Sequence, residues 1–285
     1  MPTDRPLGRI AVLGLGVMGG SIARAVSSLG LADSVAGWSP EATEREAALT
    51  AGAVSDAPPT WRDAIDGADL VVLAAPLQGC LALMAALPEG LQREATVTDV
   101  ASLKLPVAEA ARAAGLADRW IGSHPMAGSE SSGFWASRAD LFEGATVWTT
   151  VADGADSDGL GPLLVERLWS SLGGKPRSIG AAEHDRLMAL ASHLPQLASN
   201  ALARALARAD VDPSALGPGG RDMTRLSGSS PEMWTDLLRH ADPAVVEGLR
   251  ALAREADGLA DLVESGAIEQ IDRIMRETRA WRAGS

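Results

Sequence analysis

The sequence predicts an α/β fold in which a doubly wound parallel sheet is followed by an all-helical C-terminal part. Short apolar runs that alternate with helical stretches predict the sheet. A glycine-rich turn joins the first of these runs to a helix, which is typical of such sheets. After about residue 180 only helical patterns remain, so we expect domains at residues 1–180 and 181–285.

Composition narrows the class of protein. The chain has 285 residues, 46% of them hydrophobic, which is enough for one large or two ordinary domains. The net charge of −12 argues against nucleic acid and anionic membrane as main partners. The single cysteine, Cys80, excludes an intrachain disulfide and fits a reducing compartment. We therefore expect a cytoplasmic protein without a metal site.

The elements of the N-terminal domain follow in order. Strands are expected at residues 9–13, 34–38, 69–75, 95–99, 120–123 and 145–151. Helices are expected from the glycine turn to about residue 29, at 41–51 and at 105–114, and residues 163–179 indicate a helix and then a strand. The apolar stretch 70–88 contains Pro76, Gln78 and Gly79, which favour strand, loop and helix over a membrane-spanning helix.

The C-terminal domain has a helical run at 182–208, a helix at 231–240 that Ser230 or Ser229 can cap, and two apolar stripes. The stripes consist of Val245, Leu249, Leu252, Ala256, Leu259 and Val263, and of Ile268, Ile271, Met275, Thr278 and Trp281. Long helical stripes of this kind often form dimers, so we expect a homodimer through the helical domain. The alternative is that the stripes pack only on each other.

The glycine turn has the spacing Gly14-x-Gly16-x-x-Gly19 of a Rossmann-type dinucleotide site. The first glycine permits the tight turn, the second lets the backbone approach a pyrophosphate, and the third allows close helix–strand contact. Backbone N–H groups at the helix start, where Val17 and Met18 lie, would hold the phosphates. The alternative is a glycine-rich turn that binds no ligand.

The end of the second strand normally indicates which dinucleotide is bound. An acidic residue there favours NAD, whereas basic residues favour NADP. This chain has the neutral Ser39 at that point, and Arg45 lies a helical turn away. NAD and NADP therefore both remain open, with Ser39 and Pro76 expected at the cofactor site.

Pro76, the loop at 99–104 and His124 all follow predicted strands, so they should meet at the edge where parallel strands end. His124 suits a proton acceptor because histidine titrates near neutral pH; the alternative is a histidine packed beside a turn. Ser102 could cap the next helix, or it could orient His124 and a substrate oxygen. Lys104 could add positive charge near the cofactor or be solvated.

Two groups in the helical domain are candidates for substrate binding. Pro195 should bend its helix near His193, which would aim His193 into an interdomain cleft. The alternative is a surface histidine on a kinked helix. Arg225 could bind a carboxylate through two parallel hydrogen bonds, or it could be an exposed arginine in a salt bridge.

Taken in order, these motifs resemble the prephenate/arogenate dehydrogenase family of tyrosine biosynthesis. The matching segments are GLGVMG at 14–19, DVASLK at 99–104, HPMAGSE at 124–130, SHLP at 192–195 and RDMTR at 221–225, followed by Trp234. The resemblance implies NAD(P)-dependent oxidative decarboxylation of prephenate to 4-hydroxyphenylpyruvate, or of arogenate to tyrosine.

The resemblance also implies roles for individual residues. His124 would accept the proton of the ring hydroxyl, and Ser102 would hydrogen-bond in that region. Substrate contacts would come from five residues: Arg225 on a carboxylate, His193 and Trp234 in the pocket wall, Arg221 toward a neighbouring subunit's site, and Gln196. Because Gln196 stands where the family often has histidine, the choice between prephenate and arogenate remains open.

Two rival functions are compatible with a glycine turn and a helical tail. A 3-hydroxyacid dehydrogenase would depend on a lysine in the long interdomain helix, and residues 183–208 contain none. A catalytically inactive nucleotide sensor would keep the glycines but need not keep His124, Ser102 and Arg225 together.

Overall fold

The computed structural model describes residues 7–129, 131–152, 154 and 159–284, and the chain divides into two compact units. The first unit contains Met1–Asp185 and Ser229–Ala241, and the second contains Arg186–Gly228 and Asp242–Ser285. The expected division after residue 180 did not include the return of Ser229–Ala241 to the first unit. A boundary read along the sequence cannot reveal such a return.

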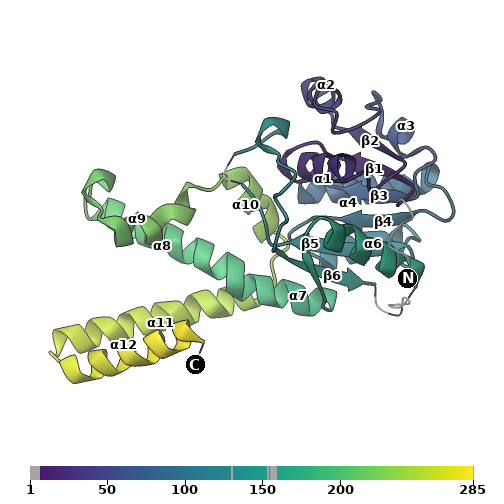
Figure 1. The fold of residues 1–285 in the computed structure, drawn as a ribbon. Helices are drawn as coiled ribbons and strands as arrows, with labels where there is room; N and C mark the ends of the chain where they lie inside the picture. The colour runs from purple at the N-terminus through teal and green to yellow at the C-terminus, as the bar shows by residue number, and fades with distance from the viewer. Residues whose placement is uncertain (1–6, 130, 153, 155–158, 285) are drawn as a thin grey trace. The chain divides into compact units, whose positions relative to one another are not determined.

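A seven-stranded sheet with the order β2-β1-β3-β4-β5-β6-β7 forms the centre of the first unit (Figure 1). The strands are β1 Arg9–Leu13, β2 Ser34–Trp38, β3 Leu70–Leu73, β4 Thr96–Asp99, β5 Trp120–Pro125, β6 Thr146–Val151 and β7 Lys175–Ser178. Each agrees with the predicted position to within a few residues. Short apolar runs bounded by turns explain this agreement for β1 to β6, whereas β7 has the polar, mostly exposed sequence KPRS.

All neighbouring strands are parallel except β5 and β6, which are antiparallel. The predicted parallel sheet is therefore confirmed at the other pairs and differs at this one. A parallel neighbour needs a crossover connection, usually a helix. The described part of the β5–β6 connection contains only the short 3₁₀ helix Phe134–Ala136, so the chain turns back instead.

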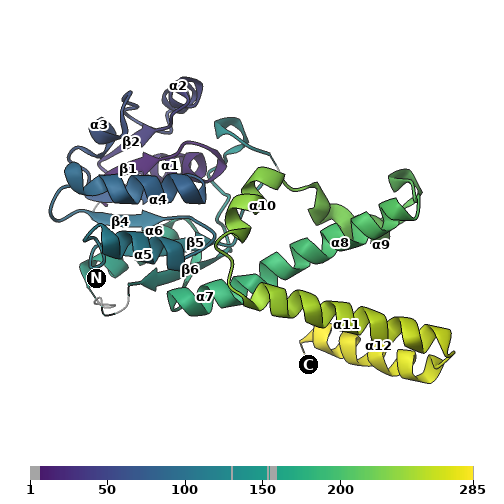
Figure 2. The same cartoon turned by 180° about the vertical axis from the view of Figure 1, so that it is seen from behind.

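Helices cover both faces of the sheet. They are α1 Val17–Ser28, α2 Ala42–Thr50, α3 Trp61–Ile65, α4 Leu77–Ala86, α5 Leu105–Ala113 and α6 Leu160–Ser171, with a 3₁₀ turn at Leu87–Glu89. Alternate residues of β1 face opposite sides. Ile10 lies in an apolar cluster with residues of α1 and α6, and Ala11 lies in one with residues of α4 and α5. Figure 2 shows α4 and α5 over the second face.

The segment that returns to the first unit forms α10, Pro231–Leu238, which packs on α4. The Ser230 hydroxyl caps α10 by accepting a hydrogen bond from the Met233 N–H, which confirms one of the two predicted caps. Gln78 and His240 side chains lie within hydrogen-bond distance, 3.0 Å, and connect this segment to α4.

The second unit is helical, as predicted. After α7, Ala181–Met188, which begins in the first unit, come a π turn at Ala189–His193, α8 Leu194–Arg208, α9 Pro218–Thr224, α11 Ala244–Glu264 and α12 Ile268–Ala283. Short 3₁₀ turns lie at Pro213–Ala215 and Arg225–Gly228. The sequence predicts a bend near His193, and at that place, directly before Pro195, the structure has the π turn. Proline cannot donate the backbone hydrogen bond that a regular helix needs, which explains the change of helix type.

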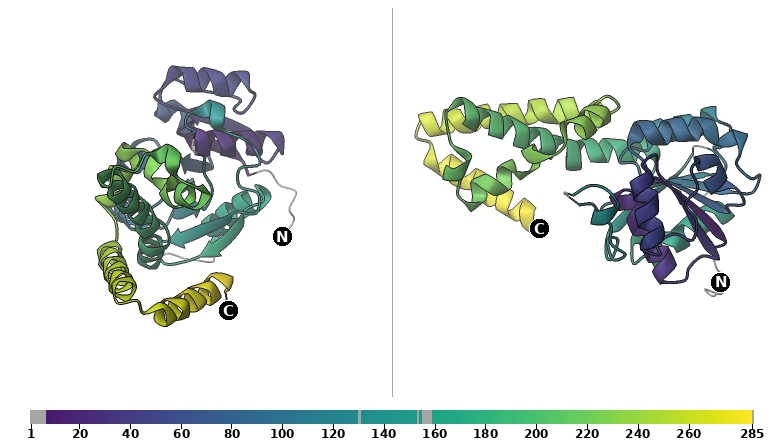
Figure 3. Two further views of the ribbon diagram at one scale, coloured as in Figure 1. Left: turned by 90° about the vertical axis from the view of Figure 1, so that its left-hand side faces the viewer. Right: turned by 90° about the horizontal axis from the view of Figure 1, so that it is seen from above.

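The last two helices, α11 and α12, diverge from the turn that joins them, so they contact each other over only part of their length (Figure 3). Their apolar stripes are only partly covered. Val263, Ile268 and Met275 each expose about two thirds of their area (67%, 67% and 65%), and Trp281 exposes 80%. Within the described residues, no helix combines the length and apolarity needed to cross a bilayer.

Candidate active site

The glycine turn has the geometry that its spacing predicts. Gly14 adopts φ +108°, and a Cβ there would lie 2.4 Å from the Ala74 carbonyl oxygen. A Cβ on Gly19 would lie 1.8 Å from the Gly14 carbonyl oxygen. A Cβ on Gly16, in contrast, would have nothing within 4 Å among the described residues. Gly14 and Gly19 therefore close the turn, while Gly16 presents bare backbone to open space.

Gly16 is also the N-cap residue of α1, directly before the helix begins at Val17, and it provides no side-chain cap for this helix end. The first backbone N–H groups of the helix can therefore bind an anion, aided by the helix dipole. Val17 and Met18 form the start of α1 and are half-buried against the core. The turn thus meets the requirements for holding a pyrophosphate.

A pocket of about 520 Å³ lies at the carboxyl ends of β1, β2 and β3. It brings together four predicted cofactor residues: Gly14, Gly16, Ser39 and Pro76. Trp38 and Trp61 also contribute to its wall. This volume and the mixture of apolar wall and bare backbone are typical of cofactor sites. The residues present therefore fit a dinucleotide.

At the end of β2, Ser39 is buried and its hydroxyl donates to the Glu44 carboxylate at 2.5 Å. Glu44 comes from α2 and lines the same pocket, as does Glu41. Arg45 donates to the Ser39 carbonyl oxygen at 2.5 Å and is not among the pocket-lining residues in the part of the chain described. A carboxylate therefore lies at the end of β2, and it belongs to Glu44 of the next helix, α2.

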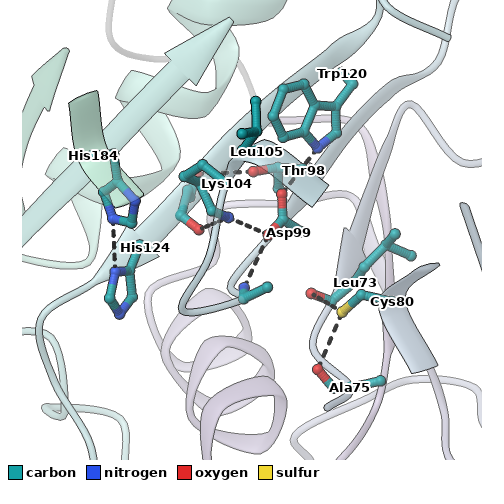
Figure 4. Close-up of polar contacts among 12 residues, drawn as sticks. Leu73, Ala75, Cys80, Thr98, Asp99, Lys104, Leu105, Trp120, His124 and His184 are labelled. Atoms are coloured by element: carbon teal, nitrogen blue, oxygen red, sulfur yellow. Dashed lines mark hydrogen bonds and ion pairs between the residues drawn. The ribbon is translucent and has the colours of Figure 1, made fainter. Parts of the chain in front are cut away.

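Lys104 is completely buried, so the alternative of a solvated lysine is wrong. Its ammonium donates to the Asp99 carboxylate and, at 2.6 Å, to the Ser123 carbonyl oxygen (Figure 4). Asp99 also accepts from the Trp120 indole and the Ala101 N–H, both at 2.9 Å. This buried pair links the ends of β4 and β5, directly before His124.

Ser123 is fixed from its side chain as well. Its hydroxyl lies 2.9 Å from that of Thr98 and accepts from the Trp169 indole at 2.9 Å. Since Ser123 precedes His124 in β5, these contacts hold the strand end that carries the histidine. The site therefore rests on a rigid element rather than on a free loop.

Cys80 lies close to this network but is not a reactive thiol. Burial, and secondly the negative charge of Asp99, raise the pKa of the Cys80 thiol to about 12. Its sulfur donates toward the Ala75 carbonyl oxygen at 3.1 Å. Because the thiolate is the nucleophilic form, Cys80 is a packing residue at neutral pH.

Ser102 is exposed and does not cap α5, so the capping alternative is wrong. The first N–H groups of α5 are instead bound by the Asp185 carboxylate, which accepts from Lys104 at 2.7 Å and from Leu105 at 2.9 Å. The Ser102 hydroxyl is therefore not needed for helix capping and remains a candidate for substrate binding.

His124 lies at the end of β5, half-buried and opposite Trp148 of β6. Its Nδ1 lies 2.9 Å from Nε2 of the buried His184, and the two rings meet edge to face (Figure 4). Nδ1 of His184 in turn lies 2.7 Å from the Asp185 carboxylate. His184 and Asp185 were not among the predicted site residues, because the signal for them is spatial: His184 is 60 residues from His124 in sequence.

The second unit contains four of the predicted substrate residues. His193 ends the π turn and is 1% exposed, so the surface-histidine alternative is wrong. Gln196 is buried in α8 and donates to the Leu226 carbonyl oxygen at 2.6 Å, which places it beside the turn that begins at Arg225. Arg221, on α9, donates to the Leu216 carbonyl oxygen at 2.6 Å.

The two remaining positions of the predicted motifs lie elsewhere. Trp234 is half-buried on α10, which belongs to the first unit. Glu130, the last residue of the HPMAGSE segment, lies outside the described residues.

Comparison with known proteins relates both halves of the chain to one family. The family model for the prephenate dehydrogenase nucleotide-binding domain matches residues 22–176, and that for the prephenate dehydrogenase dimerization domain matches residues 180–277. The prephenate dehydrogenase of Bacillus subtilis is 30% identical, over 96% of this chain and 75% of its own length.

Solved structures agree. The Aquifex aeolicus prephenate dehydrogenase in complex with hydroxyphenyl propionate and NAD⁺ matches with a TM-score of 0.88 and 27% identity, covering 98% of both chains. Synechocystis arogenate dehydrogenase matches with a TM-score of 0.82 and 28% identity, covering 96% of this chain and 98% of the other. The chain belongs to the prephenate dehydrogenase family.

Proposed function

We propose that this protein catalyses the NAD(P)-dependent oxidative decarboxylation of prephenate or arogenate. The observation that carries the proposal is the position of His124: it ends a strand of the sheet whose other strand ends form the dinucleotide pocket, and its Nδ1 is held by His184. This arrangement suits a base beside a nicotinamide cofactor. The family relationship supports the choice of substrate.

The reaction requires a base, an anion-binding group and a site from which water is excluded. A bound nicotinamide would supply the hydride acceptor for the hydroxylated ring carbon. His124 Nε2 takes the proton of the hydroxyl, which becomes a carbonyl. The bond from the ring to its carboxylate then breaks, its electrons enter the ring, and carbon dioxide leaves as the ring becomes aromatic. General-base assistance of this kind contributes about 10²- to 10⁴-fold to the rate.

The substrate carboxylate calls for a cation, and we assign that role to Arg225, whose guanidinium can make two parallel hydrogen bonds. Ser102 would hydrogen-bond near the ring hydroxyl. His193, Gln196 and Trp234 would contact the side chain of the substrate, with Arg221 reaching the site of a neighbouring subunit.

Turnover tests the proposal directly. The protein should be mixed with prephenate or arogenate and with NAD⁺ or NADP⁺, and reduced cofactor followed in the four combinations. We expect reduction in at least one combination. Cofactor binding without reduction in any of them would support an inactive nucleotide sensor, and turnover of 3-hydroxyacids alone would support the other rival.

We further propose that NAD is preferred over NADP, because the carboxylates of Glu41 and Glu44 line the pocket wall beside Ser39. A carboxylate there can accept a hydrogen bond from a ribose 2′-hydroxyl and repels a 2′-phosphate. Among the described residues that line the pocket there is no lysine or arginine to offset this repulsion.

The substitution Glu44→Gln is expected to lower the Kd for NADP⁺ about tenfold, which corresponds to about 1.4 kcal/mol. The Kd for NAD⁺ should rise slightly because a charge-assisted hydrogen bond is lost. Both constants can be measured by calorimetric titration. Glu46→Gln, on the exposed side of the same helix, is the matched control and should change neither constant. An unchanged ratio of the two constants in Glu44→Gln would remove Glu44 from cofactor selection.

We also propose a homodimer formed through α11 and α12. The exposed apolar stripe with Val263, Ile268, Met275 and Trp281 supports this, since large exposed apolar surfaces mark interaction sites. Sedimentation equilibrium is expected to give twice the 29.4 kDa chain mass. Trp281→Glu together with Met275→Glu should shift the distribution toward single chains; a wild-type protein that sediments as 29.4 kDa at micromolar concentration would contradict the proposal.

A further inference from the structure

We infer that His184 and Asp185 are positioning residues that fix the tautomer of His124, so that its Nε2 is unprotonated before substrate binds. This inference rests on the proposed function, in which His124 is the base. The inference goes beyond the proposed function because it assigns a role to the buried pair His184 and Asp185. Neither the sequence motifs nor the reaction itself requires this pair. The contacts determine which atom donates in each hydrogen bond of the series that runs from α5 through Asp185 and His184 to His124.

The series of hydrogen bonds begins at Asp185. Its carboxylate accepts two backbone hydrogen bonds at the start of α5, from Lys104 at 2.7 Å and from Leu105 at 2.9 Å. Both of its oxygens therefore accept from backbone N–H groups at the positive end of the α5 dipole. An ionised carboxylate only accepts hydrogen bonds. In the 2.7 Å contact between Asp185 and His184, Nδ1 of His184 is therefore the donor.

A neutral imidazole carries one N–H, so a His184 that donates from Nδ1 has a lone pair on Nε2. That lone pair faces Nδ1 of His124 at 2.9 Å. Nδ1 of His124 must then be the donor in this contact, which leaves Nε2 of His124 as the unprotonated nitrogen. This is the nitrogen that the proposed reaction needs as proton acceptor.

Burial makes the arrangement unique. His184 is 0% exposed and Asp185 is 2% exposed, so solvent water does not reach either partner, and breaking their contact would leave a buried polar group unsatisfied. Two further charged groups, Asp99 and Lys104, lie at the end of β4 and directly before α5. They bind each other, and the lysine also binds the Ser123 carbonyl oxygen. Their charges are thereby largely compensated, and Asp185 remains the anion that faces the histidine pair.

The same series of hydrogen bonds helps when His124 becomes protonated. The imidazolium then donates from Nδ1 to neutral His184, whose other nitrogen faces a carboxylate. This ordering resembles the general arrangement in which a buried acid orients a catalytic histidine and stabilises its charged form. Without His184, the His124 ring loses its fixed acceptor, and its neutral form can place the proton on Nε2, where it blocks base catalysis.

Nitrogen NMR of the full-length protein labelled with ¹⁵N-histidine tests this inference, because the chain has only four histidines. In the wild type, Nε2 of His124 and Nε2 of His184 should show the shifts of unprotonated imidazole nitrogens, and both Nδ1 atoms those of N–H groups. A protonated Nε2 on either ring, at a pH where the ring is neutral, would overturn the inference. This readout does not need turnover, so it separates the inference from the proposed function.

Variants at position 184 connect the tautomer with the rate. His184→Leu is expected to lower kcat about 100-fold, at the lower end of general-base contributions, and to make Nε2 of His124 protonated. His184→Gln keeps an acceptor toward His124 and should retain most of the rate and the wild-type tautomer. The cofactor Kd should stay near wild type in both. The thermal unfolding midpoint should stay near wild type in His184→Gln and should fall in His184→Leu, because the buried Asp185 carboxylate loses a hydrogen-bond donor.

His240→Asn is the matched control, because His240 is exposed and contacts Gln78 rather than His124. It should change neither kcat nor the His124 signals. A folded His184→Leu protein with an unchanged His124 tautomer would contradict the inference, whatever its rate. If His184→Leu does not fold, the wild-type spectrum and His184→Gln still decide the question.

Discussion

Replacing His124 with asparagine is expected to lower kcat by about 10²- to 10⁴-fold, because asparagine has no basic nitrogen to accept the hydroxyl proton. The backbone of position 124 pairs with Trp148 in the sheet, and asparagine can keep that pairing. The dinucleotide pocket is lined by other residues, so the Kd for the cofactor should stay nearly unchanged. Steady-state kinetics and calorimetric titration of the cofactor measure the two quantities.

A large loss of kcat with an unchanged Kd for the cofactor would identify His124 as a base. A loss of cofactor affinity that accompanies the loss of rate would indicate a structural role for His124 instead. Near-normal kcat would contradict the assignment outright. His240→Asn again serves as the control, since it removes an exposed imidazole from the same unit without touching the site.

Replacing Lys104 with methionine is expected to lower the free energy of unfolding by about 3–5 kcal/mol, the usual cost of removing one partner from a buried ion pair. The methionine fills much of the space of the lysine stem, but the Asp99 carboxylate would remain buried without its cation. The Ser123 carbonyl oxygen would also lose its donor. Urea unfolding followed by circular dichroism measures the difference from wild type.

An exposed ion pair provides the matched control. Arg138 and Asp140 lie 3.3 Å apart with side chains 60% and 57% exposed, and such pairs contribute at most about 1 kcal/mol. Arg138→Met should therefore change the free energy of unfolding only slightly. Equal effects of Lys104→Met and Arg138→Met would show that the Asp99–Lys104 pair does not stabilise the sheet edge.

Local sequence determines much of the nucleotide-binding half. An apolar run followed by Gly14, Gly16 and Gly19 specifies strand, turn and helix together. Gly14 and Gly19 meet steric demands that their neighbours impose, and Gly16 leaves the backbone open. The irregularity before Pro195 is equally local, because proline lacks an N–H. The strand ends that meet at the pocket follow from the parallel order of the first strands.

Contacts between distant residues could not be predicted in the same way. Lysine is ordinarily exposed, so only the approach of Asp99 and the Ser123 carbonyl oxygen explains the burial of Lys104. The antiparallel pairing of β5 with β6 depends on a connection without a crossover helix. α3 has five residues, which is too short for a helical period to be visible.

The choice of cofactor could not be predicted from the sequence either, because the end of β2 lacks the usual acidic residue. The sequence has Ser39 where a carboxylate would indicate NAD, and the pattern alone leaves the choice of cofactor open. The first turn of α2 brings Glu44 back to the Ser39 hydroxyl, at 2.5 Å. A residue type that is absent from one position can thus be supplied from the next helix.

In the proposed reaction oxidation is coupled to decarboxylation, and the ratio of carbon dioxide released to cofactor reduced measures this coupling. We expect equal molar amounts from the preferred substrate, because formation of the ring carbonyl leads to loss of the carboxylate in the same turnover. Reduced cofactor that accumulates while the carboxylate stays on the ring would show that the two steps are not coupled in this protein.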